Sequence, residues 1–190
     1  MRVFAAISLP EEVRRAIYMV ALKLREKGDP ASWVRPENMH LTLRFYGEVP
    51  EEKVKRLADW LSERLPRHER PLLLARSVGA FPSITRPSVL WVGLDTLSGN
   101  LDFLQQDTEL AALEIGLPAE TKPFHPHITL ARLRRPGKGT ACAGLLASFQ
   151  ENGHVPEFGR EFHAESVVLF SSALTPRGPV YKVLREMRLK

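Results

Sequence analysis

Two four-residue motifs in this chain each place a histidine two positions before a threonine. Residues 40–43 read His-Leu-Thr-Leu, and residues 127–130 read His-Ile-Thr-Leu. The side chain of histidine titrates near pH 6.5. Near neutral pH one of the pair His40 and His127 can therefore be neutral and accept a proton, while the other is protonated and donates one. The hydroxyls of Thr42 and Thr129 can donate hydrogen bonds to phosphoryl oxygens. The four side chains therefore suit general acid–base chemistry at a phosphodiester.

The alternating pattern around each motif predicts a strand with one polar face. Because successive side chains of a strand point to opposite faces, His40 and Thr42 share one face, and the leucines that follow each of them point into the core. The same alternation adds Arg44 and Tyr46 to the polar face, where they line a cleft or cap the core. One such strand would be typical of an ordinary sheet edge. Two copies in equivalent places of a repeated pattern favour a shared site.

The elements that must position these motifs occur twice in the same order: helix, His-x-Thr strand, helix, strand, strand. After a first strand at Met1–Ile7, the patterns predict a helix to about Lys27, a strand Met39–Tyr46, a helix from near Pro50, strands Leu72–Ala80 and Ser88–Leu94, a helix Ser98–Gly116, a strand His127–Leu133, a helix Thr140–Gln150, and strands Phe162–Ser171 and Val180–Leu189. The order indicates an internal duplication. If an approximate two-fold axis relates the halves, His40 and His127 meet in one cleft.

The first helix carries its own start and stop signals. Ser8 and Glu11 have the spacing of a capping box, which predicts Ser8 as the N-cap. Asp29-Pro30 is expected to end the helix. Between these signals the apolar residues recur at helical spacing and predict one buried stripe, made of Val13, Ile17, Val20 and Leu24.

Length and composition favour one compact domain over residues 1–190. The chain is 44% hydrophobic and 26% charged, and its net charge of +5 weakly favours phosphate-bearing partners. No apolar run approaches the roughly 20 residues that a membrane helix needs, and the N-terminus lacks a signal-peptide core. The single cysteine, Cys142, excludes an internal disulfide. We expect a soluble, cytoplasmic monomer.

The motifs resemble those of the 2H phosphoesterase superfamily, and within it the RNA 2′,3′-cyclic phosphodiesterases, which were first described as 2′-5′ RNA ligases. The similarity covers nearly the whole chain. The matching segments are Trp33-Val34 and residues 40–47, 79–82 and 126–132. The resemblance implies an α+β fold that is bilobal and duplicated, with two antiparallel sheets and flanking helices around a central cleft.

The resemblance also implies a reaction. The substrate would be RNA that ends in a 2′,3′-cyclic phosphate, and the product would carry a 2′-phosphate. Arg132 is expected to contact substrate phosphate beside Thr42 and Thr129, with His127 as the base and His40 as the acid. Two imidazoles and two hydroxyls supply the needed groups, and the five-membered ring is strained, so we expect no metal or other cofactor.

Other interpretations remain open at this stage. The same motifs would serve 2′-5′ ligation or a cyclic phosphodiesterase that acts on small nucleotides, and a noncatalytic RNA-end-binding module could retain the cleft. His125 and His127 could be read as two metal ligands, but no third ligand is identifiable from spacing, so a loop or cleft-edge role for His125 is favoured. Trp33 and Trp91 are expected in the core rather than on a nucleobase.

Overall fold

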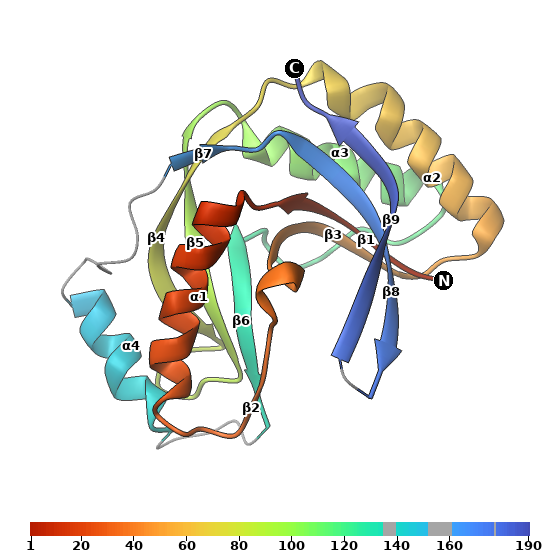
Figure 1. The fold of residues 1–190 in the computed structure, drawn as a ribbon. Helices are drawn as coiled ribbons and strands as arrows, with labels where there is room; N and C mark the ends of the chain where they lie inside the picture. The colour runs from red at the N-terminus through yellow and green to blue at the C-terminus, as the bar shows by residue number, and fades with distance from the viewer. Residues whose placement is uncertain (135–139, 152–160, 177) are drawn as a thin grey trace.

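The computed structural model describes residues 1–134, 140–151, 161–176 and 178–190. These ranges contain four α-helices and nine strands (Figure 1). The helices are α1 (Glu11–Arg25), α2 (Glu51–Arg64), α3 (Leu101–Glu114) and α4 (Cys142–Glu151). The strands are β1 (Arg2–Ser8), β2 (Ala31–Trp33), β3 (His40–Glu48), β4 (Leu72–Phe81), β5 (Val89–Ser98), β6 (His127–Leu133), β7 (Glu161–His163), β8 (Ser166–Thr175) and β9 (Gly178–Arg188).

The strands form one antiparallel sheet whose two halves have matching strand orders. The order is β7-β4-β5-β6-β3-β1-β8-β9, with β2 paired to β6. Outward from the central β6–β3 pair, β5 matches β1, β4 matches β8, and β7 matches β9. We call β3-β1-β8-β9 the His40 lobe and β7-β4-β5-β6 the His127 lobe. The expected α+β, duplicated and bilobal fold is confirmed, and the two expected sheets are joined through one residue pair, Leu41 with Ile128.

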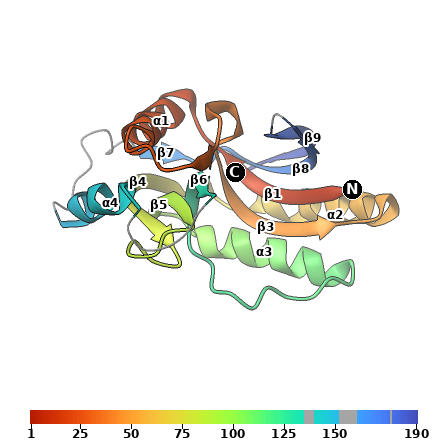
Figure 2. The same cartoon turned by 90° about the horizontal axis from the view of Figure 1, so that it is seen from below.

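Each lobe has two helices on its sheet. In the His40 lobe α3 packs against β3 and α2 against β9, and in the His127 lobe α1 packs against β6 and α4 against β4 (Figures 1 and 2). The predicted stripe of α1 is confirmed, since all four of its residues are buried. The helices therefore cover apolar faces of the sheet and hold the central strands in place. No helix in the described ranges is long and apolar enough to cross a membrane.

Two predicted helix starts are wrong. Ser8 does not cap α1, because it still belongs to β1, where it pairs with His40; Pro10 occupies the N-cap position without a side-chain bond. Likewise Ser98 remains in β5, and α3 is capped by Asn100, whose Oδ1 accepts a bond from the Phe103 amide at 3.0 Å. In both places strand pairing extends farther than the local pattern indicates.

The start of α4 depends on the residue that was expected to end α1. The carboxylate of Asp29 accepts hydrogen bonds from the amides of Ala141 (2.9 Å) and Cys142 (2.6 Å). An acidic group at a helix N-terminus satisfies free amides and complements the helix dipole. Asp29 thus links the end of α1 to the start of α4. The predicted end of α4 at Asn152-Gly153 lies outside the described residues.

Candidate active site

The central strand pair brings the two motifs side by side. Strands β3 and β6 are antiparallel, and Leu41 lies opposite Ile128. One position to either side of this pair, the register places His40 opposite Thr129 and Thr42 opposite His127. All four therefore point to the face away from Leu41 and Ile128. The two histidines are diagonal neighbours, whose Cα atoms are roughly 7–8 Å apart in such a pair.

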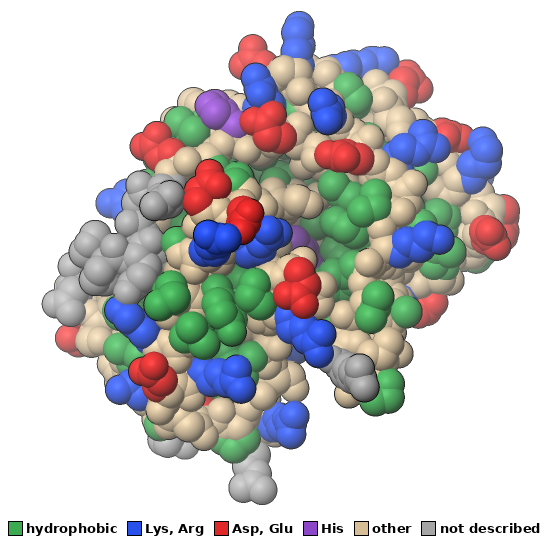
Figure 3. Space-filling model, in the orientation of Figure 1, with side chains coloured by type: hydrophobic (Ala, Val, Ile, Leu, Met, Phe, Trp, Pro, Cys, Tyr) green, Lys and Arg blue, Asp and Glu red, His purple; other side chains and the backbone are tan. Residues whose placement is uncertain are grey.

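The opposite face of these strands is fully packed. Leu41, Ile128 and Leu130 have no exposed surface, whereas His40 and His127 are partly exposed. The predicted strands with one polar face are therefore confirmed at both motifs. Because each histidine is flanked by a buried residue on a rigid central strand, its side chain is held in a fixed place. In the view of Figure 3 the surface is hollowed between the part over α1 and α4 and the part over the β8–β9 hairpin, and histidine surface is visible near the centre.

A backbone carbonyl fixes the orientation of each imidazole. His40 Nδ1 lies 2.7 Å from the carbonyl oxygen of Asn38, and His127 Nδ1 lies 2.7 Å from that of His125. A carbonyl oxygen can only accept, so Nδ1 carries the hydrogen in both rings. The Nε2 atom of each histidine is then the position that gains or loses a proton. The same bonding pattern in both lobes follows from the duplication.

The sequence interpretation gave His125 a loop or cleft-edge position. It is exposed and contributes its carbonyl to His127. Within the described ranges no three His, Cys, Asp or Glu side chains lie close enough together to hold a metal ion.

Aromatic rings surround both histidines. Phe4 stacks on His40 with ring centroids 4.9 Å apart, and Tyr181 meets the same imidazole edge-on at 5.4 Å. In the other lobe Phe81 meets His127 edge-on at 5.0 Å. Sequence reasoning missed Phe4 and Tyr181, which belong to no motif. One signal was the repeat itself. Phe170 on β8 occupies the place that Phe81 has on the matching strand β4, and its ring lies 5.2 Å from that of Phe4, its partner on β1.

The prediction that Trp91 lies in the core is wrong, because its side chain is half-buried beside His127. Its ring centroid is 6.4 Å from that of His127 and 5.2 Å from that of Phe81. The indole covers Gly79, its partner on β4, and Gly93, which pairs with His127. The indole ring therefore packs directly on the backbone of two glycines, where a side chain would displace it.

The surroundings lower the pKa of both histidines. Burial is the largest cause in each case, because removing an imidazolium from water disfavours its charge. The carbonyl that accepts from Nδ1 opposes this effect. The charge of His127 further lowers the pKa of His40, and the charges of Arg132 and His125 lower that of His127. The two rings are therefore close enough to influence each other's titration.

A β-bulge overturns the prediction that Arg44 and Tyr46 share the histidine face. Ala6 pairs with Thr42 and Ala5 with Arg44, so one extra residue shifts the alternation. Arg44 is 8% exposed and its Nε lies 3.3 Å from a carboxylate oxygen of Glu109 on α3. Tyr46 donates to the carbonyl of Thr108 at 3.2 Å, also on α3. Both side chains therefore face the core and not the cleft.

The corresponding bulge in β6 brings Arg132 onto the histidine face. Trp91 pairs with Thr129 and Leu90 with Ala131, so the extra residue again reverses the alternation. Strict alternation from His127 would have turned Arg132 away. Its charge instead lowers the pKa of both His127 and Tyr181, which lie in different lobes. All five candidate residues, His40, Thr42, His127, Thr129 and Arg132, thus share one face.

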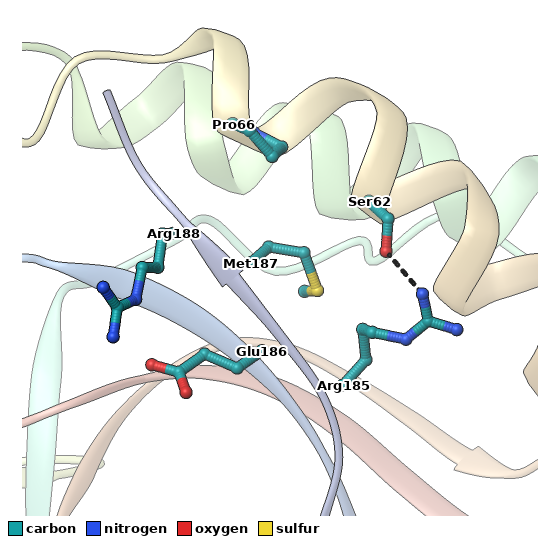
Figure 4. Close-up of a pocket in the computed structure, with 6 residues that line it drawn as sticks. All are labelled: Ser62, Pro66, Arg185, Glu186, Met187 and Arg188. Atoms are coloured by element: carbon teal, nitrogen blue, oxygen red, sulfur yellow. Dashed lines mark hydrogen bonds between the residues drawn. The ribbon is translucent and has the colours of Figure 1, made fainter.

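A separate pocket lies between α2 and β9. It has a volume of about 510 Å³, and Arg185 bonds Ser62 across it at 3.4 Å (Figure 4). The residues that line it are Ser62, Pro66, Arg185, Glu186, Met187 and Arg188. It contains no histidine and no residue of either motif. The paired motifs, not this pocket, therefore hold the groups that suit acid–base chemistry.

The chain matches one protein family over nearly its whole length. The family model described as LigT like phosphoesterase matches twice, at residues 7–91 and 92–181. Each match contains one His-x-Thr motif, which confirms the internal duplication. An RNA 2′,3′-cyclic phosphodiesterase of Aeropyrum pernix is 39% identical over 163 residues, which are 85% of this chain and 88% of that relative.

Solved structures agree with these matches. The protein TT0787 of Thermus thermophilus is 34% identical with a TM-score of 0.78, and the alignment covers 99% of this chain and 97% of that one. LigT of E. coli complexed with 3′-AMP is 26% identical with a TM-score of 0.72 and the same coverage.

Proposed function

This chain belongs to the LigT like phosphoesterases, the 2H phosphoesterase family, and we propose that it hydrolyses RNA 2′,3′-cyclic phosphate ends to 2′-phosphate ends. The observation that carries the proposal is the diagonal histidine pair, in which both Nδ1 atoms are bound to carbonyls and both Nε2 atoms are left for proton transfer. The names of the curated relatives support the substrate.

In the proposed reaction the cyclic phosphate binds between the two histidines. His127 Nε2 removes a proton from water as the water oxygen attacks phosphorus, and the bond between phosphorus and the 3′ oxygen breaks. His40 Nε2–H gives its proton to the leaving 3′ oxygen, so the phosphate remains on the 2′ oxygen. The enzyme is left with a neutral His40 and a protonated His127. Proton exchange with solvent restores the starting state.

The remaining candidate residues would bind the phosphate. Thr42 lies across the strand pair from His127, and Thr129 lies across from His40, so each hydroxyl can donate to a non-bridging oxygen. Arg132 supplies a fixed positive charge and several N–H donors on the same face. These groups stabilise the charge that develops on the phosphoryl oxygens, and we propose that no metal ion takes part.

The lowered pKa values of His40 and His127 fit their proposed roles as acid and base. At neutral pH burial favours neutral imidazoles in the free enzyme, which suits a base. A bound phosphate brings negative charge next to both rings and favours protonation of one of them, which supplies the acid. Substrate binding would thereby create the singly protonated pair.

The test is hydrolysis of a short RNA that ends in a 2′,3′-cyclic phosphate, in excess EDTA, with identification of the product phosphate. We expect a 2′-phosphate and undiminished turnover. Turnover that EDTA removes and a divalent cation restores would refute the metal-free mechanism. A 3′-phosphate product would refute the assignment of the leaving group.

A small nucleotide substrate is the second candidate. It is favoured by the solved structure of E. coli LigT complexed with 3′-AMP. Hydrolysis of cyclic mononucleotides without hydrolysis of the RNA would support it. RNA that binds with no turnover would instead indicate an end-binding module. Joining of cleaved ends through a 2′-5′ linkage would indicate a ligase, in which the 5′-hydroxyl of a second RNA attacks phosphorus in place of water.

A further inference from the structure

Among the residues that the structure describes, no α-helix packs on one face of the His40 lobe. The helices α2 and α3 lie on the other side of β3, β1, β8 and β9, and α1 packs on the His127 lobe (Figure 2). The uncovered face carries His40 and Thr42 and continues along β3 to Phe45, whose side chain is 45% exposed. An antiparallel sheet face with aromatic side chains on adjacent strands is a common platform for single-stranded nucleic acid.

The β3 bulge places Phe45 on this face. Phe45 pairs with Phe4, and Phe4 in turn stacks on His40, so the three rings lie on the same side of the sheet. The guanidinium of Arg2 lies over the Phe45 ring, 5.0 Å from its centroid. Within the described residues, Arg2 has no carboxylate at ion-pair distance. Its charge reaches Tyr181, whose pKa it lowers against the larger effect of burial.

Phe45 has no hydrogen-bond donor for the reacting phosphate. Its partner Phe4 lies two positions along β1 from Ala6, the partner of Thr42, so Phe45 is about 7 Å beyond Thr42 along the sheet. RNA that ends in a cyclic phosphate has no continuation beyond that phosphate, so its chain leaves the site only through the 5′ oxygen of the terminal nucleotide. The next residue of the substrate is therefore a nucleotide with its own base and phosphate.

The two lobes differ at the position that follows the bulge. Arg132 occupies it in β6, and Phe45 occupies it in β3. At this one position the His127 lobe therefore presents a cation and the His40 lobe an aromatic ring. An RNA end is similarly asymmetric, because its terminal phosphate is charged and its preceding nucleotide presents a base.

We propose that Phe45 and Arg2 form a subsite for the nucleotide that precedes the cyclic phosphate end. The base extends the stack formed by the Phe45 ring and the Arg2 guanidinium, and the N–H donors at the edge of the guanidinium bind the adjoining phosphate. This inference rests on the proposed RNA end hydrolysis. It makes an oligonucleotide a better substrate than a cyclic mononucleotide.

The test compares kcat/KM for a trinucleotide ending in 2′,3′-cyclic phosphate with kcat/KM for the corresponding cyclic mononucleotide. Because both are measured on the same sample, their ratio does not depend on the fraction of folded enzyme. We expect Phe45→Leu to lower the ratio about 10-fold, the size of a lost base stack, and Phe45→Trp to keep it. Phe103→Leu is the matched control, since Phe103 is 53% exposed on α3.

Salt dependence tests the phosphate contact separately. Loss of one phosphate contact reduces the slope of log kcat/KM against log salt by about 0.7 for a single strand. We expect this reduction for Arg2→Gln with the trinucleotide, and no reduction for Arg56→Gln on α2. A wild-type enzyme that hydrolyses neither substrate refutes the proposed function. An enzyme that hydrolyses both, with a ratio that Phe45→Leu leaves at the wild-type value, refutes the subsite alone.

Discussion

Replacing Gly79 with alanine should impair the reaction although Gly79 touches no substrate. A Cβ atom built at this position lies 2.9 Å from Cε2 of Trp91 and closer still to two other ring carbons. Carbon atoms in contact are normally about 3.5–4.0 Å apart, so the indole must move by about 1 Å. Because β4 and β5 are paired here, the backbone cannot easily yield instead.

The displaced indole would disturb His127. The Trp91 ring lies beside both His127 and Phe81, and Phe81 also contacts His127 edge-on. A misplacement of about 1 Å in a catalytic group can cost up to about 10²-fold in rate. Overpacking costs about 1–3 kcal/mol of stability, which in a chain of this size lowers Tm by roughly 2–12 °C. We therefore expect kcat/KM to fall by about 10-fold to 100-fold at a temperature where the variant is fully folded.

The assay is hydrolysis of the cyclic phosphate substrate, with Tm measured on the same samples. Gly144→Ala is the control, because its Cβ meets no atom within 4 Å and its site lies in α4. Trp91→Phe removes the ring carbons that clash, so Gly79→Ala should cost much less in that background. A Gly79→Ala enzyme with lowered Tm and wild-type kcat/KM would show that Trp91 does not position His127.

The other predictions concern the titrating and charged groups of the two central strands. The profile of kcat/KM against pH should be bell-shaped, because only the singly protonated histidine pair is active. Its optimum should lie below about pH 6.5, because burial lowers the pKa of both His40 and His127. A sigmoidal profile, or an optimum above that pH, would contradict this prediction. Unfolding restores the ordinary pKa of His40 and His127, so the unfolded chain binds more protons below about pH 6.5 than the folded chain does. The free energy of unfolding should therefore be highest above that pH and decline as pH falls. Thermal melts of the wild type and of His40→Ala would measure this dependence. Arg132→Gln should lower kcat/KM about 10²-fold, because a charged donor to the phosphate is lost. It should also move the acid limb of the pH profile to higher pH, because the charge of Arg132 lowers the pKa of His127. Arg132→Lys keeps the charge and should leave the acid limb in place. Arg44→Ala should lower the free energy of unfolding by about 3 kcal/mol in denaturant, because it leaves Glu109 without its buried partner. The kcat/KM of the folded variant should stay within about two-fold of the wild-type value. A large loss of activity with normal stability would instead place Arg44 in the cleft.

The sequence determined on which kind of element the candidate residues lie, and it predicted which of them carry the chemistry. The alternation around His40 and His127 depends only on local backbone geometry, in which period two separates a polar face from an apolar one. The helical stripes are equally local, and all four predicted residues of the α1 stripe are buried. The repeated order of elements indicated the duplication, and from it the meeting of the two motifs, because equivalent strands of related halves occupy equivalent places.

Tertiary structure alone decided the rest, because it depends on which strands become neighbours. The bulges that bring Phe45 and Arg132 to the histidine face, and turn Arg44 away, arise from pairing with β1 and β5, strands distant in sequence. Phe4 and Tyr181 reach His40 for the same reason. Ser8 stays in β1 instead of capping α1, because it is paired with His40. Local periodicity indicates the face of a residue only while the alternation is unbroken, and it contains no information on where pairing with a neighbouring strand leaves one residue of the strand unpaired.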